Sequence, residues 1–221
     1  MKTFSIGGVH PHDSKISANA AIESFPIPEV AYISMGQHLG APAEPIVAPG
    51  DKVKVGQLIA NANGFISAPV HSSVSGTVKG IETIFDLAGN PCKAVVITVE
   101  GDEWVETIDR SDKIEKEIKL EAKEIIEKIK ECGVVGLGGA TFPTNVKLSP
   151  PPGKKAEFLI INGAECEPYL TSDYRVLLEM PEQVLIGAQI MMKALNVTQG
   201  FIGIEENKPE AIKVMSEKAK A

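Results

Sequence analysis

The sequence predicts a β-domain followed by an α/β domain, and three observations lead to this fold class. Short β-prone runs separated by Pro and Gly turns fill the chain to about residue 105. A stretch rich in Glu and Lys, without Gly or Pro, follows at 111–131. Beyond it, helical patterns alternate with apolar strands, which is typical of α/β domains. We therefore expect two domains, 1–105 and 106–221.

Composition excludes several classes of protein. The chain has 221 residues and a formal net charge of -7, and it shows no basic patch, so we expect no nucleic-acid partner. No apolar run reaches the roughly 18 residues of a membrane span, and the N-terminal sequence lacks the apolar core of a signal peptide. Cys92, Cys132 and Cys166 are far apart, which gives neither a disulfide framework nor a CxxC metal pair and fits a reducing cytoplasm.

The first half reads as a series of short strands with turns between them, one of which lies near 45–50. The expected strands are 29–35, 56–62, 64–69, 75–82 and 93–100. Their close spacing favours a small β-domain over βαβ units.

Two segments of this half, "PGDKVKVGQLIA" (49–60) and "ISAPVHSSVSGTVKGIE" (66–82), resemble the barrel-sandwich fold of biotinyl and lipoyl carrier domains. In those domains the hairpin between the segments carries the modified lysine. Here that hairpin is "NANGF" (61–65), and the nearest lysines, Lys54 and Lys79, lie outside it. We therefore expect a compact β-module for packing or docking instead of a swinging-arm carrier.

All four histidines, His10, His12, His38 and His71, fall in this half. Histidine is the commonest metal ligand, and "HPHD" (10–13) could mimic a metal site. No Cys or third His is near it in sequence, so we expect loop or structural roles for the histidines and no metal site.

The second half begins with an expected amphipathic helix at 111–131, because apolar residues recur there at i, i+3 and i+4. Ser111 is the expected N-cap and Gly133 the expected C-cap. After it we expect a strand at 156–162, a helix at 181–195, a strand at 199–205 and a helix from Lys208.

The glycine-rich stretch "GLGGATFPT" (136–144) has two interpretations. It could be a turn that ends a helix, since glycine accepts positive φ. It could also be a cradle whose N–H groups bind an anion and whose backbone lies close to a ring, although it matches neither G-x-G-x-x-G nor a P-loop.

Polar side chains at two strand ends favour the cradle, because ligands bind at the carboxyl ends of strands in α/β sheets. Asn162, Glu165 and Glu167 follow the first strand of this half directly. Glu205 and Glu206 end the second strand, and Lys147 could supply a cation close after the glycines.

The segments "GGATFPT…K", "NGAECEP" and "GIEENKPEAI", preceded by "GGVHPHDSK" and "SAPVHSSVSGTVKGIE", resemble the RnfC family of the Rnf electron-transport complex. The resemblance covers essentially the whole chain. The second half is also similar to the flavin-carrying subunit of respiratory complex I, whose pattern is GRGGAGFPTGLK followed by N-x-D-E-x-E-P. The resemblance implies a Rossmann-like α/β domain that binds FMN non-covalently and takes hydride from NADH.

The resemblance also implies a role for each matching residue. Phe142 would stack on the NADH adenine, and Lys147 would reach the FMN phosphate or ring edge. Asn162 and Glu165 would hydrogen-bond the flavin, with Glu167 near the nicotinamide. The remaining implied contacts with flavin or nucleotide are Gly136, Gly138, Gly139, Ala140, Phe201, Glu205 and Glu206. The chemistry would belong to the cofactors, so no residue of the chain is expected to be a catalytic acid or base.

The chain departs from the family pattern at several positions. Leu137 replaces an Arg, Ala164 replaces an Asp, and Thr141 and Asn145 replace glycines. The family continues with domains that include two [4Fe–4S] clusters, whereas no cysteine of this chain has cluster spacing, so we expect a truncated flavin domain and no metal here.

The resemblance implies a bacterial, ion-translocating, membrane-associated complex that passes electrons between NADH and ferredoxin. The chain would lie on the cytoplasmic face of the membrane as a peripheral subunit, with the other Rnf subunits and NADH as partners and ferredoxin an indirect one. Two alternatives stay open. One is a non-catalytic docking or assembly module, and the other is a related flavin-dependent reductase subunit acting in a corrinoid or amino-acid reductase system.

Overall fold

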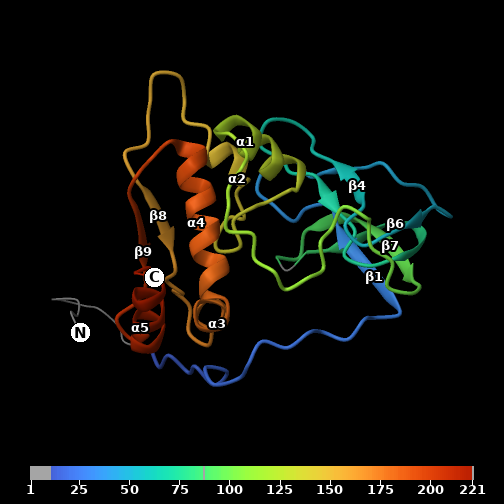
Figure 1. The fold of residues 1–221 in the computed structure, drawn as a ribbon. Helices are drawn as coiled ribbons and strands as arrows, with labels where there is room; N and C mark the ends of the chain where they lie inside the picture. Colours follow the sequence, from blue (N-terminus) through green and yellow to red (C-terminus); the bar gives the residue numbers. More distant parts are fainter. Residues whose placement is uncertain (1–10, 87, 221) are drawn as a thin grey trace. The chain divides into compact units, whose positions relative to one another are not determined.

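The computed structural model describes residues 11–86 and 88–220 (Figure 1). Packing divides them into two compact units. The β unit comprises residues 25–113 and 120–154, and the α/β unit comprises residues 11–24, 114–119 and 155–220. The expected domain boundary at residue 105 stays a prediction.

The β unit is built on two antiparallel sheets. The first has the order β1-β7-β6-β3 and consists of β1 (Val30–Ser34), β7 (Pro91–Val99), β6 (Gly76–Phe85) and β3 (Lys52–Val53). The second has the order β2-β4-β5 and consists of β2 (Glu44–Pro45), β4 (Leu58–Asn61) and β5 (Val70–His71). This arrangement agrees with the expected barrel-sandwich fold.

Four of the five strands expected in this half are present, and one is wrong. Residues 64–69 form no strand but a loop that joins β4 to β5. Within this loop Ile66 accepts one backbone bond, from the N–H of Ala41, and Pro69 has no N–H to donate, so a ladder cannot continue through it.

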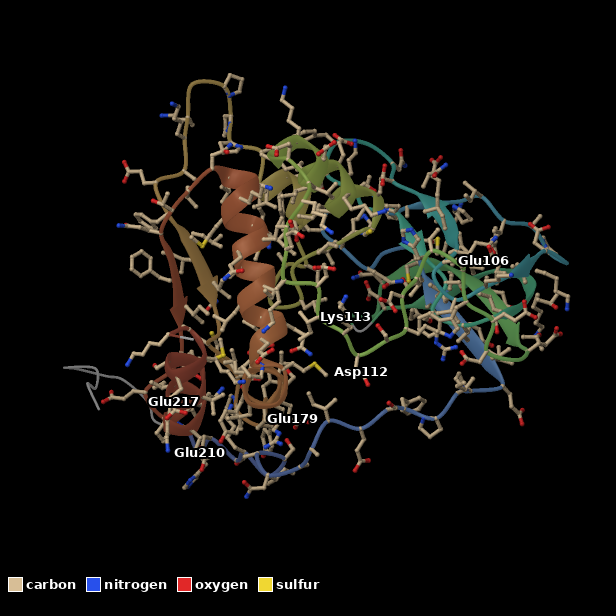
Figure 2. The ribbon with its side chains drawn as sticks, in the orientation of Figure 1. Glu106, Asp112, Lys113, Glu179, Glu210 and Glu217 are labelled. Atoms are coloured by element: carbon tan, nitrogen blue, oxygen red, sulfur yellow. The ribbon has the colours of Figure 1, made fainter. Side chains whose placement is uncertain are left out.

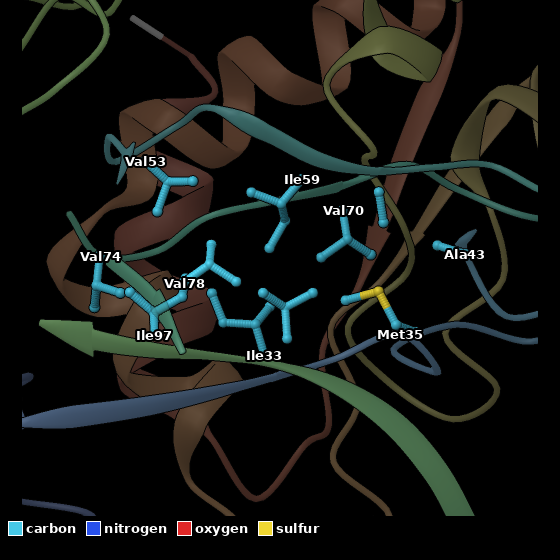
Figure 3. Close-up of a cluster of buried hydrophobic side chains, with 11 residues drawn as sticks. Ile33, Met35, Ala43, Val53, Ile59, Val70, Val74, Val78 and Ile97 are labelled. Atoms are coloured by element: carbon cyan, nitrogen blue, oxygen red, sulfur yellow. The ribbon is translucent and has the colours of Figure 1, made fainter. Parts of the chain in front are cut away.

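The core of the β unit lies between its two sheets (Figure 3). Ile33, Val78, Val95 and Ile97 alternate with outward-facing residues on the first sheet, as a strand period of two requires. Ile59 enters the core from the second sheet. Ile59 and Ile97 are both 0% exposed, so this apolar cluster is closed to water.

The helix expected at 111–131 is shorter than predicted. Helix α1 spans Ala122–Glu131 and begins at a capping box, in which the side chain of Glu124 accepts the N–H of Glu121. Residues 111–120 are not helical, and Ser111 is not an N-cap. Residues 114–119 pack within the α/β unit, where Lys193 donates to the carbonyl of Ile118, and such tertiary contacts override a weak helical propensity.

The end of α1 agrees with the expectation. Gly133 follows the C-cap residue Cys132 with φ of +64°, a left-handed conformation that favours glycine. A Cβ at this position would lie 2.3 Å from the carbonyl oxygen of Pro69, so the close approach of the two segments also requires glycine.

The α/β unit has two parallel strands, β8 (Leu159–Asn162) and β9 (Gly200–Gly203), which confirms both expected strands over shorter ranges. Helices α3 (Ser172–Glu179) and α4 (Pro181–Leu195) connect them, and α5 (Pro209–Lys218) follows β9. Helix α4 matches its predicted range, α5 begins one residue after Lys208, and α3 was not predicted. Leu177, Ala211 and Met215 form the buried centre of this unit.

We expect Ile59→Ala to destabilise the β unit by about 2 to 5 kcal/mol, because it leaves a cavity in a closed core. Trp104, the single tryptophan, belongs to this unit, so its fluorescence during urea unfolding measures the loss. Ile27→Ala is the matched control, since Ile27 is 63% exposed and should change stability by less than about 1 kcal/mol. Equal losses for the two variants would contradict the assigned core.

Candidate functional site

The glycine-rich stretch forms a closed loop in the β unit. The N–H of Gly136 donates to the carbonyl of Phe142 at 2.9 Å, and the N–H of Thr144 donates to Val134 at 3.0 Å. Short helix α2 (Thr144–Lys147) begins where the loop ends. The N–H of Leu39 donates to the carbonyl of Thr141 at 3.3 Å, which ties the loop to the rest of the unit.

The N–H groups of the loop point to an anion site. Among the described residues, no acceptor pairs with any of the six consecutive N–H groups from Leu137 to Phe142. Gly139 and Thr141 have φ of +59° and +48°, and such left-handed residues let neighbouring N–H groups converge on an anion. Thr141 thus keeps a conformation that a glycine favours, at the position where the family pattern has one.

Lys147 lies against this loop. A Cβ at Gly136 would be 2.7 Å from the Nζ of Lys147, so glycine leaves the room that the ammonium occupies. Lys147 makes no ion pair or hydrogen bond with any residue that the structure describes. A cation with no protein partner beside unpaired N–H groups is suited to a phosphate or another anion.

The strand-end residues come together in the α/β unit. Asn162 pairs with Gly203 at the carboxyl ends of β8 and β9, so the segments that follow both strands begin at the same edge. The N–H of Gly163 donates to the carbonyl of Gly203 at 2.8 Å, and the N–H of Glu165 donates to the carboxylate of Glu205 at 3.3 Å. The predicted meeting of the two strand ends is therefore present.

A buried ion pair lies behind this edge. The ammonium of Lys208 bonds the carboxylate of Glu165 directly and that of Glu205 at 3.2 Å. Lys208 and Glu165 are each 5% exposed. The ammonium also lies 5.8 Å from the ring centroid of Tyr174, within cation–π range. Because α5 begins directly after Lys208, its positive helix terminus would repel this cation without the two carboxylates.

Glu165 also caps α3. Its carboxylate accepts the N–H of Asp173 at 2.7 Å and that of Tyr174 at 3.4 Å, at a helix start where the N-cap side chain makes no bond. Burial alone would raise the pKa of Glu165, but the bond to Lys208 and the N–H of Asp173 together hold that pKa below its usual range. The group therefore stays ionised and engaged inside the protein.

The predicted site residues fall into two sets, one in each unit. Gly136, Gly138, Gly139, Ala140, Phe142 and Lys147 belong to the β unit, and Asn162, Glu165, Glu167, Phe201, Glu205 and Glu206 belong to the α/β unit. Asn162, Glu167 and Glu206 are exposed. Phe201 is the second residue of β9 and packs edge-to-face on Phe158, with ring centroids 5.8 Å apart, away from the strand end. The roles of these residues toward flavin and NADH stay predictions.

The sequence analysis missed Lys208. One signal could have found it: a cation directly before a Pro that starts a helix is unfavourable and needs a carboxylate partner. Two acidic residues, Glu205 and Glu206, precede it in the sequence.

The histidines of the described residues show no metal chemistry. His38 is buried, and its Nε2 lies 3.1 Å from the Ala41 carbonyl oxygen and 3.0 Å from the N–H nitrogen of Ala68. Burial lowers the pKa of His71. Across 11–86 and 88–220 no group of three or more His, Cys, Asp or Glu side chains could hold a metal ion, and His10 lies outside these ranges. Over the same ranges, no helix combines the length and apolar character needed to cross a bilayer.

Comparison with known families agrees with both units. Residues 2–102 match the family described as the RnfC barrel sandwich hybrid domain, and residues 129–221 match the Nuo51 FMN-binding domain. Fold and site thus define a class of redox protein in which a barrel-sandwich module precedes an FMN-binding α/β domain.

Known relatives identify the family within this class, and each is the C-type component of its complex. The relative from the proton-translocating ferredoxin:NAD(+) oxidoreductase complex of Clostridium ljungdahlii is 51% identical over 97% of this chain and 47% of the relative. The relative from the Na(+)-translocating ferredoxin:NAD(+) oxidoreductase complex of Acetobacterium woodii is 44% identical, over 95% and 47%. The relative from the ion-translocating oxidoreductase complex of Rhodobacter capsulatus is 41% identical, over 98% and 42%.

The chain belongs to the RnfC family, whose members are components of ion-translocating oxidoreductase complexes. It spans about half the length of the curated relatives that it matches.

We expect the stability of the α/β unit to depend on pH through Glu165. Its pKa is lower in the folded than in the unfolded chain, so its contribution is present above about pH 4.3 and is lost as the pH falls through the folded value. Glu165→Gln should cost roughly 3 kcal/mol at pH 7, because Lys208 stays buried with a weaker partner.

Far-UV circular dichroism during thermal unfolding, recorded at pH 7 and at pH 3, measures this difference. The gap between wild type and Glu165→Gln should narrow at the lower pH, where the wild-type carboxylate is protonated. Glu217→Gln is the control, since Glu217 is exposed on α5 and makes no ion pair with a described residue. A gap that is independent of pH would contradict the ion pair.

Proposed function

We propose that this chain supplies the flavin site of an Rnf-type complex, which passes electrons between NADH and ferredoxin and couples their flow to ion translocation. The observation that carries the proposal is the glycine loop, with six consecutive unpaired N–H groups and the Lys147 ammonium beside them. Support also comes from the match of residues 129–221 to an FMN-binding domain and from the names of the relatives.

The residues of the loop fit the phosphate end of FMN. Unpaired N–H groups are strong donors for a phosphate oxygen, and Lys147 adds a positive charge that is not neutralised within the described chain. Gly138 and Gly139 carry no side chain, and no described atom lies within 4 Å of where a Cβ would stand, so the backbone is open to a ligand. Bound FMN would accept hydride and release single electrons.

The strand-end residues fit the polar edges of a flavin and a nicotinamide nucleotide. Asn162 would hold a flavin edge, and the exposed carboxylates of Glu167 and Glu206 would accept ribose hydroxyls or the nicotinamide amide. Both carboxyl oxygens of Glu165 already accept bonds from the protein, so we assign it the task of holding the edge in place. Phe142 would stack on the adenine.

The proposed partners are NADH, the other subunits of the complex and, through them, ferredoxin. We place the chain at the cytoplasmic face of the membrane as a peripheral subunit, as the resemblance to RnfC implies. The [4Fe–4S] clusters of the family would lie outside this chain. A docking module without flavin is the competing function, and the open glycine loop favours flavin binding because a docking surface has no need for six unpaired N–H groups.

We expect Lys147→Met to weaken FMN binding about tenfold, because a charged donor to the phosphate is lost. Quenching of flavin fluorescence during titration measures the affinity. Lys154→Met is the matched control, since Lys154 is exposed in the same unit, and it should bind like wild type. The proposal fails if the wild-type protein binds no FMN, or if both variants bind equally.

Asn162→Ala should also weaken FMN binding, because an amide that can bond the flavin is removed from the strand edge. The same titration measures it, with circular dichroism as a check that α3 to α5 remain folded. Wild-type flavin affinity in a folded Asn162→Ala protein would remove this residue from the site.

A further inference from the structure

A segment near the N-terminus, residues 13–22, packs within the α/β unit although the sequence places it before the β-domain. We call it the N-terminal strap. It runs along the loop 163–171, which joins β8 to α3 and carries Glu165 and Glu167. The function proposed above gives the strap no task.

Three hydrogen bonds join the strap to the far half of this loop. The Nζ of Lys15 donates to the carbonyl of Glu167 at 3.0 Å and to that of Leu170 at 2.7 Å. The N–H of Tyr169 donates to the carbonyl of Asp13 at 2.8 Å. The strap thus bonds the backbone at three of the four residues from Glu167 to Leu170.

Further contacts anchor the strap on α3. The hydroxyls of Ser17 and Thr171 lie 2.7 Å apart, and Nη1 of Arg175 donates to the carbonyl of Ala18 at 3.0 Å. The N–H of Ile22 donates to the carboxylate of Glu179 at 3.1 Å (Figure 2). Arg175 also pairs with Glu179, so the helix side of the contact is itself fixed.

Backbone strain is concentrated where the strap meets the loop. Ser14 has φ of +47° and Tyr169 has φ of +71°, and both lie in the left-handed region that non-glycine residues avoid. Such conformations persist only when the surroundings fix them, and they are concentrated at functional sites. The bonds of Asp13 and Lys15 lie next to both strained residues.

We propose that Lys15 is a positioning residue for the nucleotide site. Its ammonium, bonded to two carbonyls on either side of Tyr169, holds the loop so that Glu167 projects from a fixed backbone. Lys15 makes no ion pair with a described residue, so holding the backbone is the use that the structure gives its charge. This inference rests on the proposed flavin–nucleotide function, because a loop that is ordered in advance lowers the entropic cost of binding.

The test compares Lys15→Met, Lys15→Arg and Lys213→Met in the intact protein. Lys213 is exposed on α5 and makes no ion pair with a described residue, so it is the matched control. Hydrogen exchange of the peptide that contains Tyr169 and Leu170 measures the order of the loop, and titrations with FMN and NADH measure the site.

For Lys15→Met we expect at least about tenfold faster exchange at Tyr169 and about fivefold weaker NADH binding, with unchanged helix content. Lys15→Arg keeps two donors for two carbonyls and should restore most of both effects. Lys213→Met should behave like wild type.

The outcomes separate this inference from the proposed function. Wild-type exchange, or faster exchange with wild-type NADH affinity, in Lys15→Met would overturn the positioning role alone. A wild-type protein that binds neither FMN nor NADH would overturn the proposed function, and the positioning role with it.

Discussion

The α/β unit depends on the buried contact between Lys208 and Glu165. Removing either charge would leave the other without its partner in a site closed to water, which is costly. The same carboxylate caps α3, and the same ammonium stands at the start of α5 and bonds Glu205. One ion pair therefore joins both strand-end segments to the helices that follow them.

This constraint explains which strand-end groups face solvent. Glu165 and Lys208 are occupied inside the protein, while Asn162, Glu167 and Glu206 are exposed at the edge that they support. The backbone under Glu167 is held from the other side by the strap. In the β unit, the glycine loop follows a different principle, since its N–H groups have no acceptor among the described residues and its lysine has no counter-ion there.

Local patterns predicted much of this structure. The period of two fixed the strands of the β unit, and the apolar spacing and Pro181 placed α4 over its full range. The same spacing overextended α1, because residues 114–119 use tertiary bonds that no local pattern reveals. Lys208 and the strap were missed for the same reason: their partners are 43 and about 150 residues away in the chain. The glycine loop and strand-end carboxylates were found because their residue types are themselves unusual.

The most direct measurement is an FMN titration of 15N-labelled protein, followed through its amide resonances. If the glycine loop cradles the phosphate, the N–H signals of Gly138, Gly139 and Ala140 should shift in a saturable way with a single FMN, because their donors gain an acceptor. The account is contradicted if FMN binds while these three signals stay in place, or if no signal of the protein responds.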